Sequence, residues 1–238
     1  MDKIFTKNIE HESAVKHVTG KAIYTDDISE PKNLLHAVIG YSNCSKGVIK
    51  KIDYKDVLSS EGVVDIITEK DIEGINDVGP IFKGDKIFTS KNIEYYGQPI
   101  FAVIAKTNNL AKKAALKVKI DLKISKPIVS IEEALKKKSF VLKPKHLTRG
   151  NIKDGFKKSD NFLKGKLYSG GQDHFYLEGQ IAMTIPQEDN NFLVYSSTQH
   201  PSETQQIIGK VLKQNYNSIH VIVRRIGGGF GGKETQSF

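Results

Sequence analysis

The sequence predicts an α+β fold, and three observations support this prediction. Its 238 residues are 38% hydrophobic and 26% charged, as in a soluble globular protein. Short apolar runs with the length and composition of strands are separated by turn-forming or helical stretches. A lysine-rich stretch containing two prolines then precedes a second set of alternating segments. We therefore expect an α+β first domain, a connecting segment and a second domain.

The strand candidates of the first domain are brief and rich in Val, Ile, Leu or Phe: Leu34–Tyr41, Gly62–Thr68 and Ile100–Ala105. Two stretches between and after them have helical patterns, Asp56–Ser60 and Asn108–Val118. In the second of these helices, Leu110, Ala114 and the residues from Leu116 to Val118 fall roughly on one face. This periodicity predicts that the helix packs on the first domain's core.

The connection is expected in the lysine-rich stretch from Ser125 to about Lys158, which contains Pro127 and Pro144. One weak helix is predicted inside it, at Ile131–Lys137. The second domain should then contain four strands and one helix. The strands are expected at Gly165–Ser169, Ile181–Ile185, Phe192–Ser196 and Ser218–Arg225.

The helix of the second domain is expected from about Glu203 to Gln214. Ser202 is a plausible N-cap, because Gln205 three residues later would close a capping box. The apolar side chains of Ile207, Ile208 and Val211 share one face of this helix.

The formal net charge of +9 raises the possibility of a nucleic-acid-binding protein. Only three of the 36 basic residues are arginines, Arg149, Arg224 and Arg225, and arginine makes the better bidentate contacts to phosphates and bases. The lysines are also dispersed along the chain. These features favour a solvated lysine-rich surface and no nucleic-acid partner.

Other broad classes are disfavoured by simple counts. Cys44 is the single cysteine, so it closes no intrachain disulfide and has no neighbours at the spacing of a metal site. We expect it to be a small packed side chain. No apolar run approaches the roughly 18 residues that span a bilayer, and residues 1–12 lack the apolar core of a secretory signal. A cytoplasmic location without membrane contact is expected.

The strongest local feature is the glycine-rich run Gly227–Glu234, directly after a predicted strand. Five glycines in six positions predict a backbone that approaches another group closely or adopts positive φ angles. The run fits G-x-G-x-x-G, but the sequence ends at Phe238, without the helix, second strand and acidic residue of a dinucleotide-binding unit. Glu234 also occupies the Ser or Thr position of a P-loop. What remains is a glycine loop with an exposed aromatic, Phe230, and a carboxylate, or else a tight hairpin with a solvated Glu234.

A second feature is the string Gly170–Glu178, in which a glycine pair precedes Gln172, Asp173 and His174. Gln172 has both a donor and an acceptor with which to hold a polar ligand. His174 beside Asp173 is compatible with acid–base catalysis, but no nucleophile is evident. A structural role is the favoured interpretation of His174.

These strings resemble the molybdenum hydroxylases of the xanthine dehydrogenase and aldehyde oxidase family. The strings from Gln172 to Glu178 and from Phe230 to Thr235 look specifically like the xanthine dehydrogenase branch of that family. The resemblance covers nearly the whole chain, and further matching segments are Thr19–Ile28, Tyr96–Ile100 and Ser197–Gln199.

The resemblance implies a domain order. Residues 1–125 would form the family's α/β hammerhead domain, 126–150 a connecting segment, and 151–238 the beginning of its molybdopterin-binding α+β domain. It also implies part of an enzyme that oxidises hypoxanthine and xanthine to urate with oxygen from water. Electrons would pass through iron–sulfur clusters and FAD on a partner subunit to NAD.

The resemblance implies roles for four residues. Gln172 would approach the molybdenum of the molybdopterin cofactor, where an amide hydrogen-bonds a ligand without displacing it. Phe230, also near the molybdenum, and Gly231 would line the cofactor side of the pocket. Glu234 would orient the purine and help stabilise charge that develops during the reaction. Aldehyde oxidases lack an acid at this position, so Glu234 favours a purine.

The resemblance also implies what this chain lacks. The family's catalytic base, its substrate-binding arginine and most pterin contacts belong to a carboxy-terminal half, which we expect as a partner, so this chain alone should be inactive. Gln236 replaces an arginine that is usual in the family. The alternatives are a nonenzymatic remnant or assembly module of that subunit, or an aldehyde-oxidising relative.

Overall fold

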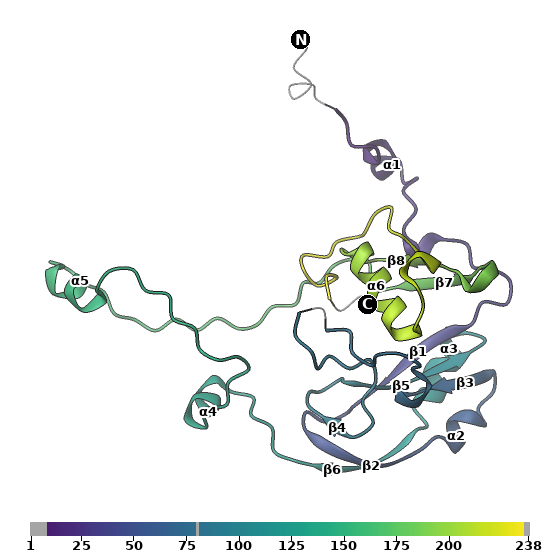
Figure 1. The fold of residues 1–238 in the computed structure, drawn as a ribbon, viewed down its shortest axis with the longest axis horizontal. Coiled ribbons are helices and arrows are strands. Elements are labelled where there is room, and N and C mark those ends of the chain that lie inside the picture. Colours follow the sequence, from purple (N-terminus) through teal and green to yellow (C-terminus); the bar gives the residue numbers. More distant parts are fainter. Residues whose placement is uncertain (1–8, 80, 236–238) are drawn as a thin grey trace. The chain divides into compact units, whose positions relative to one another are not determined.

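The computed structural model describes residues 9–79 and 81–235, so Gln236 lies outside the described part. The chain divides into two units (Figure 1). The main unit comprises the residues up to Ile124 together with those from His174 onwards, and the middle unit is Ser125–Asp173. No helix in the described ranges is long and apolar enough to cross a membrane.

The first part of the main unit contains two three-stranded antiparallel sheets. The first has the order β1-β5-β3 and consists of β1 (His36–Tyr41), β5 (Pro99–Ala105) and β3 (Val63–Ile67). The second has the order β4-β2-β6 and consists of β4 (Asn92–Ile93), β2 (Gly47–Asp53) and β6 (Lys119–Ile124). Three helices belong to this part: α1 (Ala14–Val18), α2 (Lys55–Leu58) and α3 (Asn108–Ala115).

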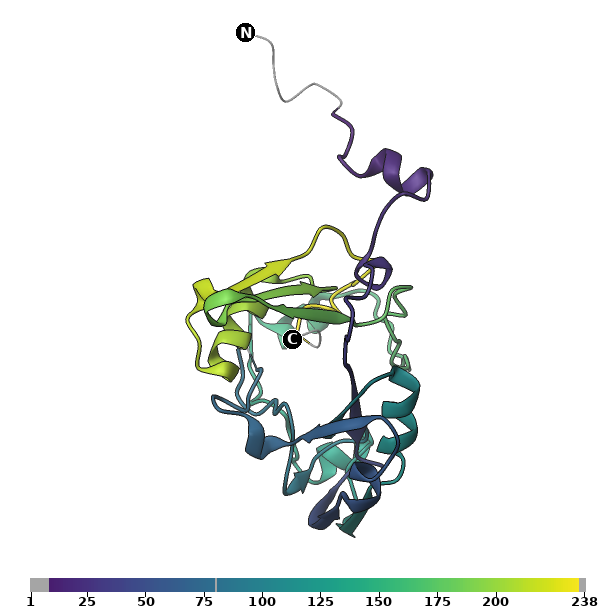
Figure 2. The same cartoon turned by 90° about the vertical axis from the view of Figure 1, so that its right-hand side faces the viewer.

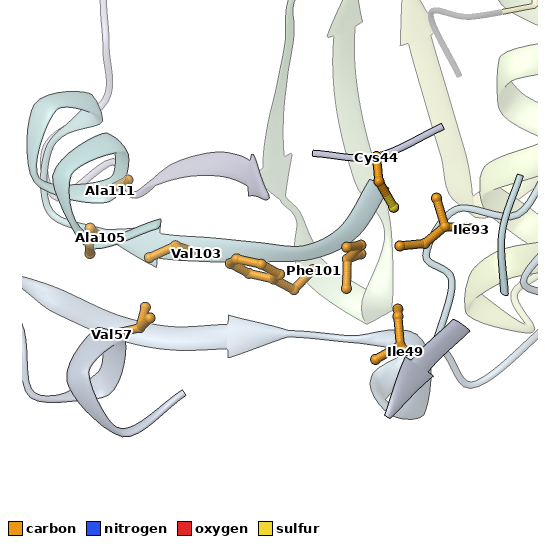
Figure 3. Close-up of a cluster of buried hydrophobic side chains, with 10 residues drawn as sticks. Cys44, Ile49, Val57, Ile93, Phe101, Val103, Ala105 and Ala111 are labelled. Carbon is orange, nitrogen blue, oxygen red and sulfur yellow. The ribbon is translucent and has the colours of Figure 1, made fainter. Parts of the chain in front are cut away.

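The core of this part lies along the central strand β5, as Figure 3 shows. Phe101 and Val103 are fully buried, and the predicted packing of Cys44 is confirmed because it belongs to the same cluster. A Cβ on Gly40 of β1 would lie only 2.1 Å from the Phe101 ring, so this position must be glycine for the ring to fit. The ring also meets Tyr54 edge-on, with centroids 5.3 Å apart.

Helix α3 begins where the sequence predicts, with the side chain of Thr107 accepting a hydrogen bond from Leu110 N at 3.2 Å. Ala111 and Ala114 are buried against the sheet. The helix ends at Ala115 instead of Val118, and Leu116 is exposed, so its predicted place on the packed face is wrong. Strand β6 begins shortly after the helix, at Lys119, and the sequence did not predict this strand.

The second part of the main unit is a three-stranded sheet with the order β7-β8-β9. Its strands are β7 (Ala182–Pro186), β8 (Phe192–Ser196) and β9 (Ile219–Ile222). β7 and β8 are antiparallel, whereas β8 and β9 are parallel. A parallel pair requires a crossover connection, which α6 (Pro201–Leu212) provides, lying against the sheet in Figure 2.

Helix α6 starts earlier than predicted. Its N-cap is His200 and its first residue is Pro201, so the predicted cap at Ser202 is wrong. Proline favours the first helical position because its fixed φ suits a helix and its missing N–H would be unpaired there. Ile207 is buried, as its predicted place on the apolar face requires.

A long-range contact fastens the beginning of the described chain to the end of this sheet. Arg225 Nη1 donates a hydrogen bond to the carbonyl oxygen of Ile23 at 2.6 Å, and Nη2 donates to Ser13 Oγ at 3.3 Å. Ser13 is buried. One guanidinium group therefore holds two points of the segment that precedes β1.

The middle unit is built differently. It contains the short helices α4 (Ile131–Lys136) and α5 (Ile152–Lys158), and no strand occurs within 125–173, all of which is described. The predicted strand at Gly165–Ser169 is wrong, because these residues are irregular and exposed and have no neighbouring strand with which to pair. Many large apolar side chains of the unit are exposed, including Val141, Leu147, Phe156, Phe162, Leu163 and Leu167.

Candidate active site

The glycine-rich loop follows β9 and shows both properties predicted from its composition. A Cβ on Gly229 would lie 2.6 Å from Gln199 Oε1, so any other residue there would displace the end of that side chain. Gly231 has a φ of +88°. Between them, Phe230 adopts a left-handed φ of +52° and its side chain is 74% exposed. The loop therefore displays an aromatic ring in a conformation that the surrounding backbone must stabilise.

Gln199, just beyond β8, supplies much of that stabilisation. Its Oε1 accepts hydrogen bonds from Gly231 N at 3.0 Å and from Lys233 N at 3.3 Å. Its own N–H donates to the carbonyl oxygen of Lys233 at 2.8 Å, and Thr198 Oγ1 lies 3.4 Å from the same oxygen. The residues after β8 thus fix the position of the loop after β9.

A buried ion pair lies beneath the loop. Lys233 is 0% exposed and its Nζ lies 3.0 Å from Oε2 of Glu178, whose side chain is 8% exposed. The same oxygen accepts a hydrogen bond from Gly227 N at 2.7 Å. Glu178 Oε1 is buried and receives no hydrogen bond from the described residues. The Lys233 ammonium also lies 4.8 Å from the Tyr176 ring centroid, within cation–π range.

This ion pair was missed by sequence reasoning, although both residues lie in the two strings that were singled out. The available signal was a charged residue in each string, and no local pattern connects the two. Burial of a charge requires a partner, so the two clusters are joined by Glu178 and Lys233.

Glu234 lies one residue beyond the buried lysine, and its side chain is 53% exposed. Its Oε1 is 3.2 Å from Nε2 of His200, the N-cap of α6, and His200 Nδ1 is 3.7 Å from Glu203 Oε2. The residues of the loop form turns, not a paired hairpin. Glu234 is therefore not merely solvated, and it has an imidazole partner that the sequence did not predict.

The structure brings Phe230, Gly231 and Glu234 together on one loop. Gln172 is exposed and belongs to the middle unit. His174 is exposed and lies over Gly232, where an added Cβ would be 3.0 Å from the imidazole Cγ. Among the described residues, no group of three or more His, Cys, Asp or Glu could hold a metal ion. The chemistry offered by the loop comes from backbone amides, an aromatic ring and a carboxylate.

Comparison with known families assigns most of the chain. Residues 19–126 match the a/b hammerhead domain of aldehyde oxidase and xanthine dehydrogenase, and residues 133–238 match the molybdopterin cofactor-binding domain. The chain belongs to the xanthine dehydrogenase and aldehyde oxidase family. The predicted fold, a hammerhead domain followed by a molybdopterin-binding α+β domain, is confirmed.

Curated members of this family are similar over nearly the whole chain. Xanthine dehydrogenase from Dictyostelium discoideum is 39% identical over 98% of this chain and 17% of its own length. Xanthine dehydrogenase/oxidase from Gallus gallus is 38% identical over 95% of this chain, and aldehyde oxidase 1 from Bos taurus is 38% identical over 96%. The chain spans 17% of the length of each of these three relatives.

Two solved structures show the same fold. Aldehyde oxidoreductase from Desulfovibrio gigas superimposes with a TM-score of 0.78 at 25% identity, covering 91% of this chain and 26% of that one. Quinoline 2-oxidoreductase from Pseudomonas putida 86 superimposes with a TM-score of 0.81 at 19% identity, over 96% of this chain and 32% of that one.

Proposed function

We propose that this chain is part of a molybdenum hydroxylase that oxidises hypoxanthine and xanthine to urate. Membership of the family supports the reaction class, and relatives named xanthine dehydrogenase support the substrate. The proposal of a purine substrate rests on Glu234, whose carboxylate lies half-exposed on the glycine loop. Curated aldehyde oxidases are 38% identical to the chain, so overall similarity does not separate the two substrate classes.

Each proposed step replaces a purine C–H bond by C–OH. The oxygen comes from water, and two electrons and two protons are released. When bound, the molybdenum cofactor supplies the redox chemistry of this step. The electrons would pass through the iron–sulfur clusters and FAD of a partner subunit to NAD, which takes up both electrons and one proton to become NADH.

The glycine loop fits a cofactor on its open side. Apart from its two chain neighbours, no described residue comes within 4 Å of a Cβ placed on Gly231, and the neighbouring Phe230 ring is exposed, whereas Gly229 is packed against Gln199. Phe230 and Gly231 would line the cofactor side of the pocket. Gln172, from the middle unit, would hydrogen-bond a ligand of the metal. Glu234 would accept a hydrogen bond from a purine N–H and stabilise charge that develops on the ring.

The exposed apolar side chains of the middle unit support a further protein partner. The curated relatives are much longer, since the chain spans only 17% of them. We propose that the carboxy-terminal half of the molybdenum subunit covers these side chains and supplies the catalytic base. A nonenzymatic assembly module with the same fold would keep this partner but lack turnover.

The first test is co-purification of the tagged chain from its native cell, with molybdenum analysis and an assay of xanthine-dependent NAD reduction. We expect a large partner, bound molybdenum and activity. A chain that purifies alone and without metal would contradict the proposal and favour a nonenzymatic remnant.

A second test addresses the substrate. In the complete enzyme, Glu234→Gln should strongly reduce hypoxanthine oxidation while the molybdenum content stays unchanged. Glu61→Gln is the matched control, because Glu61 is an exposed glutamate of the hammerhead domain. Normal hypoxanthine oxidation by the Glu234 variant would overturn the assignment of a purine substrate.

A further inference from the structure

We propose that His200 is the positioning residue of Glu234, holding the carboxylate in the orientation in which it receives the purine. The contact that indicates this role joins His200 Nε2 to Glu234 Oε1 at 3.2 Å. The inference rests on the proposed function, because it assigns a role to a neighbour of the substrate-binding carboxylate. It extends that function to the residue that directly follows the matching segment Ser197–Gln199.

His200 has a fixed backbone from which to act. Its N–H donates to Thr198 Oγ1 at 3.1 Å. Its carbonyl oxygen accepts from both the N–H and the Oγ1 of Thr204, each at 2.9 Å. Both threonines are buried, so solvent does not compete for these bonds. The His200 side chain therefore projects from a fixed backbone position at the start of α6.

The backbone also explains why Glu234 lies opposite. Gln199 and Lys233 are hydrogen-bonded to each other, and His200 and Glu234 are the next residues in the two segments. The Lys233 side chain is anchored below the loop by Glu178. Both side chains of the His200–Glu234 contact thus extend from positions that other bonds have already fixed.

The chemistry of the pair sets the sign of this contact. An ionised carboxylate offers only lone pairs, so the 3.2 Å contact is attractive when Nε2 of His200 carries a proton. On the other side of the ring, Nδ1 lies 3.7 Å from Glu203 Oε2, within ion-pair range. His200 engages one oxygen of Glu234 and leaves the other for a ligand. A carboxylate held in this way loses less conformational freedom on binding, which favours affinity.

The test uses the complete enzyme and three variants, His200→Ala, His200→Gln and the control His220→Ala, whose residue is exposed on β9. We expect His200→Ala to raise the hypoxanthine KM by about fivefold, the factor that corresponds to the roughly 1 kcal/mol of a half-exposed ion pair. The Kd of urate, the proposed product, measured by equilibrium dialysis should rise by a similar factor. His200→Gln should restore both values, because its Nε2–H reaches the same carboxylate, and His220→Ala should change neither.

Each outcome distinguishes this inference from the proposed function. If Glu234→Gln impairs purine turnover while His200→Ala keeps a normal KM and urate Kd, the inference is overturned and the proposed function stands. If Glu234→Gln itself has no effect, the proposed function fails. If the His200→Ala enzyme loses molybdenum or thermal stability, its KM is not informative, and the KM of the His200→Gln enzyme is the deciding measurement. A stable His200→Gln enzyme with a KM near the native value supports the positioning role, and one with a raised KM overturns it.

Discussion

Gln199 and Lys233 are bonded to each other in both directions. The N–H of Gln199 donates to the carbonyl oxygen of Lys233 at 2.8 Å, and the N–H of Lys233 donates to Oε1 of Gln199 at 3.3 Å. This pair joins the residues just after β8 to the glycine loop that follows β9. It determines where the exposed side chains of Phe230 and Glu234 emerge.

Removing the Gln199 side chain should loosen the loop. Gln199→Ala loses two hydrogen bonds, and we expect the free energy of unfolding to fall by about 1–2 kcal/mol. Gly229→Ala should cost a similar amount, because its Cβ would displace the same amide group. The two effects should not add in a double-mutant cycle measured by urea unfolding. Gly165→Ala, whose Cβ meets nothing within 4 Å, is the control, and an additive cycle would contradict this account.

Breaking the buried ion pair should have a larger effect. Lys233→Met would leave the Glu178 carboxylate buried without its cation, and we expect a loss of about 3–5 kcal/mol in unfolding free energy. The double variant with Glu178→Leu should recover part of this loss, since no unpaired charge remains. A single variant as stable as the native chain in chemical denaturation would show that the pair is not important for stability.

The hammerhead core should be sensitive at Phe101. This side chain is fully buried beneath Gly40, so Phe101→Ala should lower the unfolding free energy by about 3–5 kcal/mol through the cavity it creates. Phe156→Ala is a matched control, because Phe156 is exposed in the middle unit and should change stability by no more than about 0.5 kcal/mol. Equal effects of the two substitutions would place the core elsewhere.

The stability of the hammerhead domain should fall at high pH. Burial, and secondarily the negative charge of Asp71, raises the pKa of Tyr54 to about 12. A raised pKa in the folded state contributes stability that is fully present below the ordinary pKa of 10 and is lost as the pH rises to about 12. Urea midpoints measured from pH 9 to 12 should decline more for the native chain than for Tyr54→Phe. Parallel curves would refute the role of Tyr54.

Local patterns predicted the elements that depend on their own residues. The strand at Phe192–Ser196 and the start of the helix at Asn108 agree with the structure, because an apolar run and a threonine cap define them locally. Strands β2 and β6 were missed. Both carry lysines and aspartates among their apolar residues and pair with each other, placing Lys51 opposite Asp121, so their strand character depends on a distant partner.

The candidate site was predicted unevenly for the same reason. The glycine loop was identified because its unusual composition is contiguous along the chain. His200 was missed, although the recognised string ended at Gln199, since its contact with Glu234 exists only after β8 and β9 have paired. The buried Glu178–Lys233 pair likewise joins two strings whose proximity no spacing rule predicts.

The guanidinium of Arg225 has a consequence for the order in which the protein is made. Its partners, Ile23 and Ser13, precede it by 202 and 212 positions. Ribosomes add about 5–20 residues per second, so the opening segment must wait on the order of 10–40 s after its own synthesis before its fastening point is made. During that interval the segment before β1 is available to chaperones and proteases. The segment before β1 is thus secured only after about 200 further residues have been added.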